Sequence, residues 1–213
     1  MEKKIFLDKV QLYVIVDKAL CYPRNIEKIT SQAIEGGAQM IQFRDKESSD
    51  RDFLTVAERI KRITDKNRIP FIINDRLDIA SYLNCDGVHL GQEDLPFYVA
   101  KKIFKKGKII GVSAKTLKEA KEAEKMGADY IGLGPVFYTT SKEIEKTIGV
   151  EVIRKAVKEI KVPVFPIGGI NQNNVSKLVK VGCRRAAVIS AVICTEDVKK
   201  AAKELLERLK KND

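Results

Sequence analysis

The stretch Ile72–Pro96, IINDRLDIASYLNCDGVHLGQEDLP, combines two short apolar runs with a carboxylate after each of them. The runs Pro70–Ile73 and Gly87–Leu90 have the length of buried strands, and Asp75 and Asp94 fall in the loops that follow. If the two strands are parallel neighbours, both loops leave the same edge of the sheet and the carboxylates converge. Converging carboxylates are suitable ligands for a hard divalent cation, so this stretch predicts a metal site.

The same alternation of apolar strands and amphipathic helices continues along the whole chain of 213 residues. Eight such units predict a (β/α)8 TIM barrel of the α/β class, because open doubly wound sheets more often have five or six strands. We expect residues 1–213 to form this single domain, with residues 1–10 as a short N-terminal extension. The predicted strands are Leu12–Val16, Met40–Phe43, Phe71–Ile73, Val88–Leu90, Ile109–Val112, Tyr130–Leu133, Val164–Ile167 and Ala186–Ile189, and the predicted helices include Asp52–Ile63, Leu117–Met126, Val150–Ile160, Val175–Val181 and Asp197–Leu209.

Composition narrows the range of partners. The net charge is +11 at pH 7, but the lysines are spread over every predicted helix rather than gathered in one stripe, so we expect no nucleic-acid partner. A diffuse positive field equally suits small phosphorylated anions. No apolar run approaches the roughly 20 residues that span a bilayer, and no secretory signal is evident, so we expect a cytoplasmic protein without a membrane partner. The oligomeric state is left open, a homo-oligomer included.

The sequence offers no set of ligands for a zinc site. The cysteines are widely spaced, with no C-x-x-C pair, and there is one histidine. Reduced and mostly buried thiols are the expectation. The residues concerned are Cys21, Cys85, Cys183, Cys194 and His89.

The second predicted strand carries polar side chains at alternate positions. If Ile41 and Phe43 pack outward beneath helices, then Gln42, Arg44 and Lys46 point toward the barrel interior. A solvated surface run after the strand is the alternative. The regular alternation with apolar neighbours favours three polar groups directed into one cavity.

Other strands contribute polar side chains and glycines to the interior. The same alternation turns Asn74, His89 and Ser113 inward, and His89 is better interpreted as a packed or orienting residue than as a base. Inward glycines near the strand ends indicate a ligand cavity, with tight turns as the alternative. These glycines are Gly111, Gly132 and Gly134.

Two phosphate sites are predicted. Gly168 and Gly169 follow the seventh strand, and Ile189 and Ser190 follow the eighth, where barrels often bind a phosphate through backbone N–H groups. Cations near the metal carboxylates suit a diphosphate, namely Arg44, Lys46 and Lys142. The residues therefore predict a reaction between a diphosphate and a monophosphate. The long loop 135–148 lies on the same side and is a candidate lid over the diphosphate.

Several motifs, in order along nearly the whole chain, resemble the thiamine-phosphate synthase family. DGVHLGQEDLP is the most specific of them, whereas IGGI alone carries little weight. The motifs are QFRDK (42–46), IINDR (72–76), DGVHLGQEDLP (86–96), IIGVS (109–113), GADYIGLGPVF (127–137), TTSK (139–142), IGGI (167–170) and VISAVI (188–193).

The resemblance implies a (β/α)8 transferase that uses Mg²⁺. Its reaction would join 4-amino-2-methyl-5-hydroxymethylpyrimidine diphosphate to 4-methyl-5-(2-hydroxyethyl)thiazole phosphate, giving thiamine phosphate and pyrophosphate. Asp75 and Asp94 would bind the metal. The pyrimidine diphosphate would be bound by Gln42, Arg44, Lys46, Asn74, Ser113 and Lys142, and the thiazole phosphate by Thr139, Thr140, Ser141, Gly169, Ile189 and Ser190. Catalysis would rest on Arg44, Lys46, Ser113 and Lys142.

Three positions depart from the family pattern. Lys115 stands where histidine is frequent, Tyr138 where proline is usual, and Arg184-Arg185 replaces an acidic-glycine pair before the eighth strand. We expect the first two to border the pocket and the third to affect stability. A related thiazole tautomerase is one rival, although such relatives use a histidine at Lys115 and lack the complete polar set. A catalytically silent phosphate-binding barrel is the other.

Overall fold

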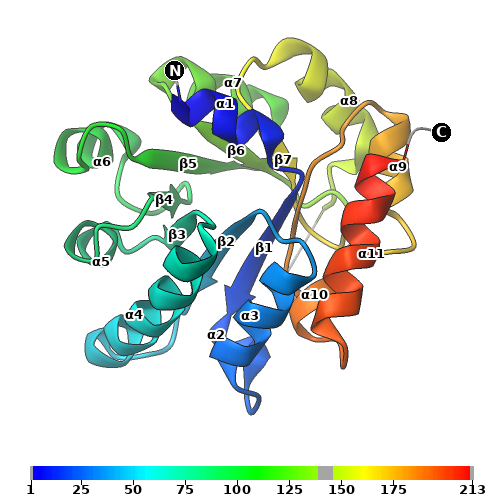
Figure 1. Ribbon diagram of the computed structural model, residues 1–213. Helices are drawn as coiled ribbons and strands as arrows, with labels where there is room; N and C mark the ends of the chain where they lie inside the picture. Colours follow the sequence, from blue (N-terminus) through cyan, green and yellow to red (C-terminus); the bar gives the residue numbers. More distant parts are fainter. Residues whose placement is uncertain (1, 139–145, 212–213) are drawn as a thin grey trace.

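The computed structural model describes residues 2–138 and 146–211. Within these residues eight parallel strands form one sheet in the order β7-β6-β5-β4-β3-β2-β1-β8. β7 also lies beside β8, so the sheet curls into a nearly closed barrel with helices around its outside (Figure 1). The predicted (β/α)8 barrel is confirmed. The strands are β1 (Leu12–Asp17), β2 (Met40–Arg44), β3 (Phe71–Asn74), β4 (Gly87–Leu90), β5 (Ile109–Ala114), β6 (Tyr130–Leu133), β7 (Val164–Pro166) and β8 (Ala186–Val188).

Every predicted strand is present, with ends that differ by at most two residues. The described helices include short ones that the sequence pattern did not single out. No helix in the described ranges is both long enough and apolar enough to cross a membrane. The helices are α1 (Glu2–Lys9), α2 (Lys18–Cys21), α3 (Ile26–Glu35), α4 (Asp50–Asn67), α5 (Leu77–Tyr82), α6 (Phe97–Ile103), α7 (Leu117–Met126), α8 (Gly149–Glu159), α9 (Val175–Lys180), α10 (Ser190–Ile193) and α11 (Val198–Lys210).

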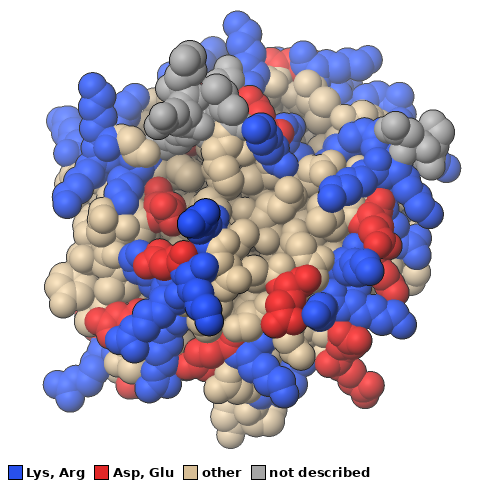
Figure 2. Space-filling view, in the orientation of Figure 1, with Lys and Arg blue, Asp and Glu red and all other residues tan. Residues whose placement is uncertain are grey.

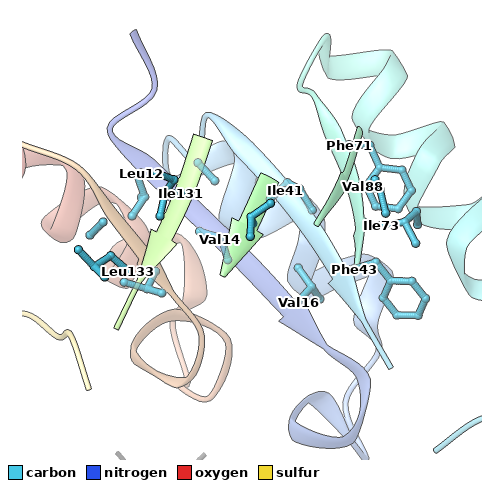
Figure 3. Packing of buried hydrophobic residues seen from close by; sticks show 14 of the residues in the cluster. Leu12, Val14, Val16, Ile41, Phe43, Phe71, Ile73, Val88, Ile131 and Leu133 are labelled. Atoms are coloured by element: carbon cyan, nitrogen blue, oxygen red, sulfur yellow. The ribbon is translucent and has the colours of Figure 1, made fainter. Parts of the chain in front are cut away.

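Alternate residues of each strand face two separate cores. Leu12, Val14 and Val16 point outward and pack beneath the helices, as the labelled side chains in Figure 3 show. Tyr13 and Ile15 point into the barrel interior. Burying one such aliphatic side chain stabilises the fold by roughly 1.5–3 kcal/mol, so slipping a strand by one residue would reverse every face at large cost. The hydrophobic alternation therefore fixes which side chains reach the barrel interior.

The first residues of the chain close one end of the barrel. Leu7 and Val10 are buried and belong to the interior cluster that contains Tyr13 and Phe165. α1 thus lies at the amino-terminal ends of the strands and leaves their carboxyl ends to the loops. The assignment of residues 1–10 as a short extension of a single domain stays a prediction.

The Arg184-Arg185 pair joins both ends of the chain to the start of β8. Arg184 Nη1 donates to the last carbonyls of α11, at 3.3 Å from Leu209 O and 2.6 Å from Lys211 O. Arg185 Nη2 donates to Asp8 O at 2.8 Å. A cation bonded to the last carbonyls of a helix stabilises that helix end. The geometry supports the expectation that this departure concerns stability.

Replacing Arg184 by alanine should lower the free energy of unfolding by about 1–2 kcal/mol, because the carboxyl end of α11 loses its hydrogen bonds and a favourable charge. Chemical denaturation of the variant and the wild type would measure the difference. Lys180→Ala removes an exposed positive charge from nearby α9 and should change stability little. Equal stability of the R184A variant and the wild type would contradict the assignment.

Candidate functional site

Arg44 and Asp17 form an ion pair at the carboxyl ends of β1 and β2. The parallel register sets Asp17 opposite Arg44, and Arg44 Nη1 donates to Asp17 Oδ2. The other oxygen of this buried carboxylate accepts from the Leu20 amide at 3.2 Å and caps the start of α2. Asp17 is thereby held by two partners, and it holds the Arg44 guanidinium at the barrel mouth.

Asp75 and Asp94 converge as predicted. Asp75 has a left-handed φ of 61°, a conformation that costs a non-glycine residue about 1–3 kcal/mol. Its N–H donates across to the His89 carbonyl on β4 at 2.8 Å, so the chain turns toward the neighbouring strand. Asp94 Oδ2 accepts from the Gly91 N–H at 2.6 Å, which holds the loop after β4. The two carboxyl groups then lie within hydrogen-bonding reach of each other.

Two donors contact the same oxygen of Asp75. Asn74 Nδ2 donates to Asp75 Oδ2 at 2.6 Å, and Lys46 Nζ forms an ion pair with that oxygen. Lys46 comes from the loop after β2, which places a cation beside the carboxylate pair. Five of the predicted site residues are therefore brought together at one edge of the barrel, namely Arg44, Lys46, Asn74, Asp75 and Asp94.

The carboxylate pair has an unequal affinity for protons. Burial and the hydrogen bond with Asp94 raise the pKa of Asp75 to about 6. Burial acts in the same direction on Asp94, but its bonds with Asp75 and the Gly91 N–H outweigh burial and lower its pKa below the ordinary value. Two partly desolvated carboxylates in contact are stabilised by a shared proton or by a cation.

The donor set fits Mg²⁺ better than a metal that needs a complete protein cage. Among the described residues, no cluster of three or more His, Cys, Asp and Glu side chains could hold a metal ion. Mg²⁺ is commonly bound through one or two carboxylates, with water and substrate phosphates as the remaining ligands. Asp75 and Asp94 supply such a pair, and Asp75 already binds the cationic Lys46.

The interior below this edge contains the remaining polar strand residues. Gln42 is buried and donates through Nε2 to the Tyr13 hydroxyl. His89 Nε2 lies 2.8 Å from Ser113 Oγ, and His89 Nδ1 lies 2.9 Å from the Tyr130 hydroxyl. His89 is thus a packed interior residue oriented by hydroxyl groups, in agreement with the sequence interpretation.

The inward glycines make room for protein atoms rather than for a ligand cavity. A Cβ atom at Gly111 would lie 2.1 Å from Cζ of the Tyr130 ring, and one at Gly132 would lie 3.2 Å from His89 Cε1. At Gly134 a Cβ atom would lie 2.1 Å from the carbonyl oxygen of Ile167, the residue directly after β7. The interpretation of these glycines as cavity residues is wrong, because neighbouring rings and backbone fill the space.

The loop after β7 approaches the loop after β6. Gly168 and Gly169 have φ values of 96° and 65°, and a Cβ atom at Gly169 would lie 2.2 Å from Tyr138 O. Ile189 precedes α10, which begins at Ser190. These residues lie at the carboxyl edge of the barrel, as predicted. The predicted residues Thr139, Thr140, Ser141 and Lys142 lie outside the described residues, as does part of the loop 135–148.

Three functional candidates escaped the sequence reasoning. Asp17 ends an apolar run in the same way as Asp75, so the signal was available, but its pairing with Arg44 depends on strand register. Tyr13 and Tyr130 were assignable to the interior by alternation with their apolar neighbours. Nothing in the sequence indicated that their hydroxyl groups meet.

The two departures near the site are exposed. The Lys115 side chain is exposed, and its N–H donates to Glu119 Oε2 at 2.7 Å at the start of α7. Tyr138 is 75% exposed, and its carbonyl approaches Gly169. Lys115 follows Ser113 by two residues, so it lies near the barrel edge with its side chain directed toward solvent.

Positive charge is distributed over the surface. Figure 2 shows Lys and Arg side chains around most of the visible face, with Asp and Glu side chains between them. This face therefore carries no single basic stripe. The expected lack of a nucleic-acid partner stays a prediction.

Comparison with known proteins gives consistent results. The family model described as thiamine monophosphate synthase matches residues 12–192. A thiamine-phosphate synthase of Ruminiclostridium cellulolyticum is 46% identical over 92% of this chain and 93% of its own length, and one of Clostridium tetani is 43% identical over 91% and 93%. A solved thiamine phosphate pyrophosphorylase from Pyrococcus furiosus superposes with a TM-score of 0.86 at 40% identity, covering 98% of both chains.

Proposed function

This chain belongs to the thiamine monophosphate synthase family, and from that premise we infer the reaction and the residues that carry it out. It is a transferase that couples 4-amino-2-methyl-5-hydroxymethylpyrimidine diphosphate with 4-methyl-5-(2-hydroxyethyl)thiazole phosphate, giving thiamine phosphate and pyrophosphate. The observation that carries the site assignment is the contact between the Asp75–Asp94 pair and Lys46, with Arg44 on the same edge of the barrel. A diphosphate leaving group requires such a combination of cations and metal-binding carboxylates.

Asp75 and Asp94 would hold Mg²⁺ at the carboxyl ends of β3 and β4. When bound, the ion supplies positive charge that stabilises a departing pyrophosphate. The family resemblance assigns Gln42, Asn74 and Ser113 to the pyrimidine substrate. It assigns the thiazole phosphate to Thr139, Thr140, Ser141, Gly169, Ile189 and Ser190.

The chain's own cations act on the leaving group. Arg44, Lys46 and Lys142 stabilise the negative charge that develops as the carbon–oxygen bond to the pyrophosphate breaks. The pyrimidine methylene is left as a cation, and the thiazole nitrogen attacks it with its lone pair. Since that nitrogen carries no proton, the reaction needs no general base. The interior position and hydroxyl partners of His89 agree with this.

The experiment that tests the function is a coupling assay with purified, folded protein, both phosphorylated substrates and Mg²⁺. We expect thiamine phosphate and pyrophosphate in equal amounts, and none when either substrate or the metal is omitted. Tautomerisation of a thiazole phosphate without coupling would instead indicate the tautomerase alternative. Substrate binding without any product would indicate the non-catalytic barrel.

Mg²⁺ affinity should fall as the pH falls below about 6, because binding must displace the proton held by Asp75. In the metal-free protein this raised pKa means that the folded state binds more protons than the unfolded state. Stability without metal should therefore decrease as the pH rises from about 4 toward 6, and Mg²⁺ should stabilise most above that range. Release of one proton corresponds to about a tenfold change in affinity per pH unit.

Calorimetric titration with Mg²⁺ alone, in buffers of different ionisation enthalpy, would count the protons released. Asp75→Asn provides the control, since it removes the titrating group and should abolish the pH dependence together with most of the binding. An affinity that is constant across this pH range in the wild-type protein would contradict the prediction.

A further inference from the structure

Five polar side chains on five strands form one hydrogen-bond chain through the barrel interior. Gln42 Nε2 donates to the Tyr13 hydroxyl, which lies 2.8 Å from the Tyr130 hydroxyl. Tyr130 is 2.9 Å from His89 Nδ1, and His89 Nε2 is 2.8 Å from Ser113 Oγ. The two residues at the ends of this hydrogen-bond network, Gln42 and Ser113, are assigned to the substrate above. The two tyrosines have no assigned role.

We propose that Tyr130 is a positioning residue that fixes His89 in its neutral Nε2–H tautomer, so that the Ser113 hydroxyl keeps its own proton for the bound ligand. The part that concerns the ligand rests on the proposed function. The part that concerns the tautomer does not.

The direction of donation along these hydrogen bonds is set at Gln42. The Gln42 amide is oriented with Nε2 toward Tyr13, and in this orientation the Tyr13 oxygen accepts from it. Tyr13 can then donate to Tyr130, or Tyr130 can donate to Tyr13. In the second arrangement the Tyr13 proton would have no acceptor among the described residues that contact it. Leaving a buried hydroxyl unpaired costs about 1–3 kcal/mol, so Tyr13 donates to Tyr130.

The positions of the remaining protons follow from this direction. With its oxygen occupied by Tyr13, the Tyr130 hydroxyl donates to His89 Nδ1. Burial raises the pKa of both phenols, so both remain protonated donors. A neutral imidazole that accepts at Nδ1 carries its proton at Nε2, and this proton is donated to Ser113 Oγ. The Ser113 proton is then directed away from His89.

Packing holds the rings in this arrangement independently of the hydrogen bonds. The rings of Tyr13, Tyr130 and Phe165 meet edge to face with centroids 5.6–5.7 Å apart, and His89 stacks on Tyr130 at 5.4 Å. Gly111 leaves the room that the Tyr130 ring occupies. Removing one hydroxyl group therefore preserves the aromatic packing, and the phenylalanine variants should fold.

The test uses the fact that His89 is the only histidine of the chain. Its ring ¹⁵N resonances can be assigned without ambiguity in ligand-free protein, at a pH above the ordinary histidine pKa of about 6.5. We expect a pyridine-type nitrogen at Nδ1 and a pyrrole-type nitrogen at Nε2. Tyr130→Phe should move both shifts toward a mixture of tautomers, because Nδ1 loses its donor.

Tyr13→Phe is the matched control, because it removes one buried interior hydroxyl while the Gln42 amide, which also reaches the Tyr130 hydroxyl, can still donate to the Tyr130 oxygen. It should keep the wild-type tautomer. A protonated Nδ1 in the wild-type protein, or unchanged shifts in the Y130F variant, would overturn the proposal.

Steady-state kinetics separates this inference from the proposed function. Tyr130→Phe should lower kcat/KM for the pyrimidine diphosphate roughly 3- to 10-fold, the effect of one weakened hydrogen bond, and leave the KM for the thiazole phosphate unchanged. If the wild-type protein has no coupling activity but shows the expected tautomer, the proposed function fails and Tyr130 remains the residue that sets His89. An active enzyme with the opposite tautomer refutes the positioning role alone.

Discussion

Asp94→Asn should reduce Mg²⁺-dependent kcat/KM by roughly 10²–10³-fold while the barrel stays folded. Losses of this size are typical when one preorganised electrostatic contact to a transition state is removed. Asparagine retains an oxygen that can accept from the Gly91 N–H, so the loop after β4 should keep its shape. What it lacks is the negative charge that, together with Asp75, would hold the cation. Asp94→Ala should lose activity at least as completely.

Glu93 provides the matched control, because it is an exposed carboxylate one residue earlier in the same loop. Glu93→Gln should keep nearly full activity at every Mg²⁺ concentration. Initial rates over a series of Mg²⁺ concentrations, together with circular dichroism spectra of each variant, would make the comparison. Wild-type turnover in the Asp94 variants would remove this residue from the metal site.

The convergence of the two carboxylates was predictable because the carboxyl ends of parallel strands meet at one edge of a barrel. The alternation of apolar residues was sufficient to place Asp75 and Asp94 after neighbouring strands. The left-handed backbone of Asp75 and its raised pKa were not predictable in this way. They depend on the hydrogen bond to the His89 carbonyl and on the distance between the two loops, which only the assembled barrel defines.

A glycine in a strand is harder to interpret from the sequence than a residue with a side chain. Gly111 and Gly132 indicate that other atoms approach the backbone closely. The sequence cannot distinguish a ligand from a neighbouring ring, because both require a glycine at the same position. The first ten residues pose a similar difficulty, because their charges suggest a solvated segment while Leu7 and Val10 seal the barrel end. Long-range packing decides both cases.

Arg44→Ala should reduce kcat/KM by roughly 10²–10³-fold, because the departing pyrophosphate loses a guanidinium that can donate two parallel hydrogen bonds. The same change leaves the buried Asp17 carboxylate without its ionic partner. Breaking a buried ion pair from one side costs about 3–5 kcal/mol, so the variant should also be less stable. Activity must therefore be compared at a temperature where the variant is folded.

Arg44→Lys separates the two effects. A lysine at this position keeps a positive charge near Asp17, so most of the stability should return. It lacks the planar fork of donors, and only part of the activity should return with it. Arg76→Ala is the control, because Arg76 lies after β3 at the same end of the barrel but is paired with the exposed carboxylates of Asp50 and Asp78. If R44K regained full activity, or if R76A lost as much as R44A, a general positive field would explain the result better than a specific contact with the leaving group.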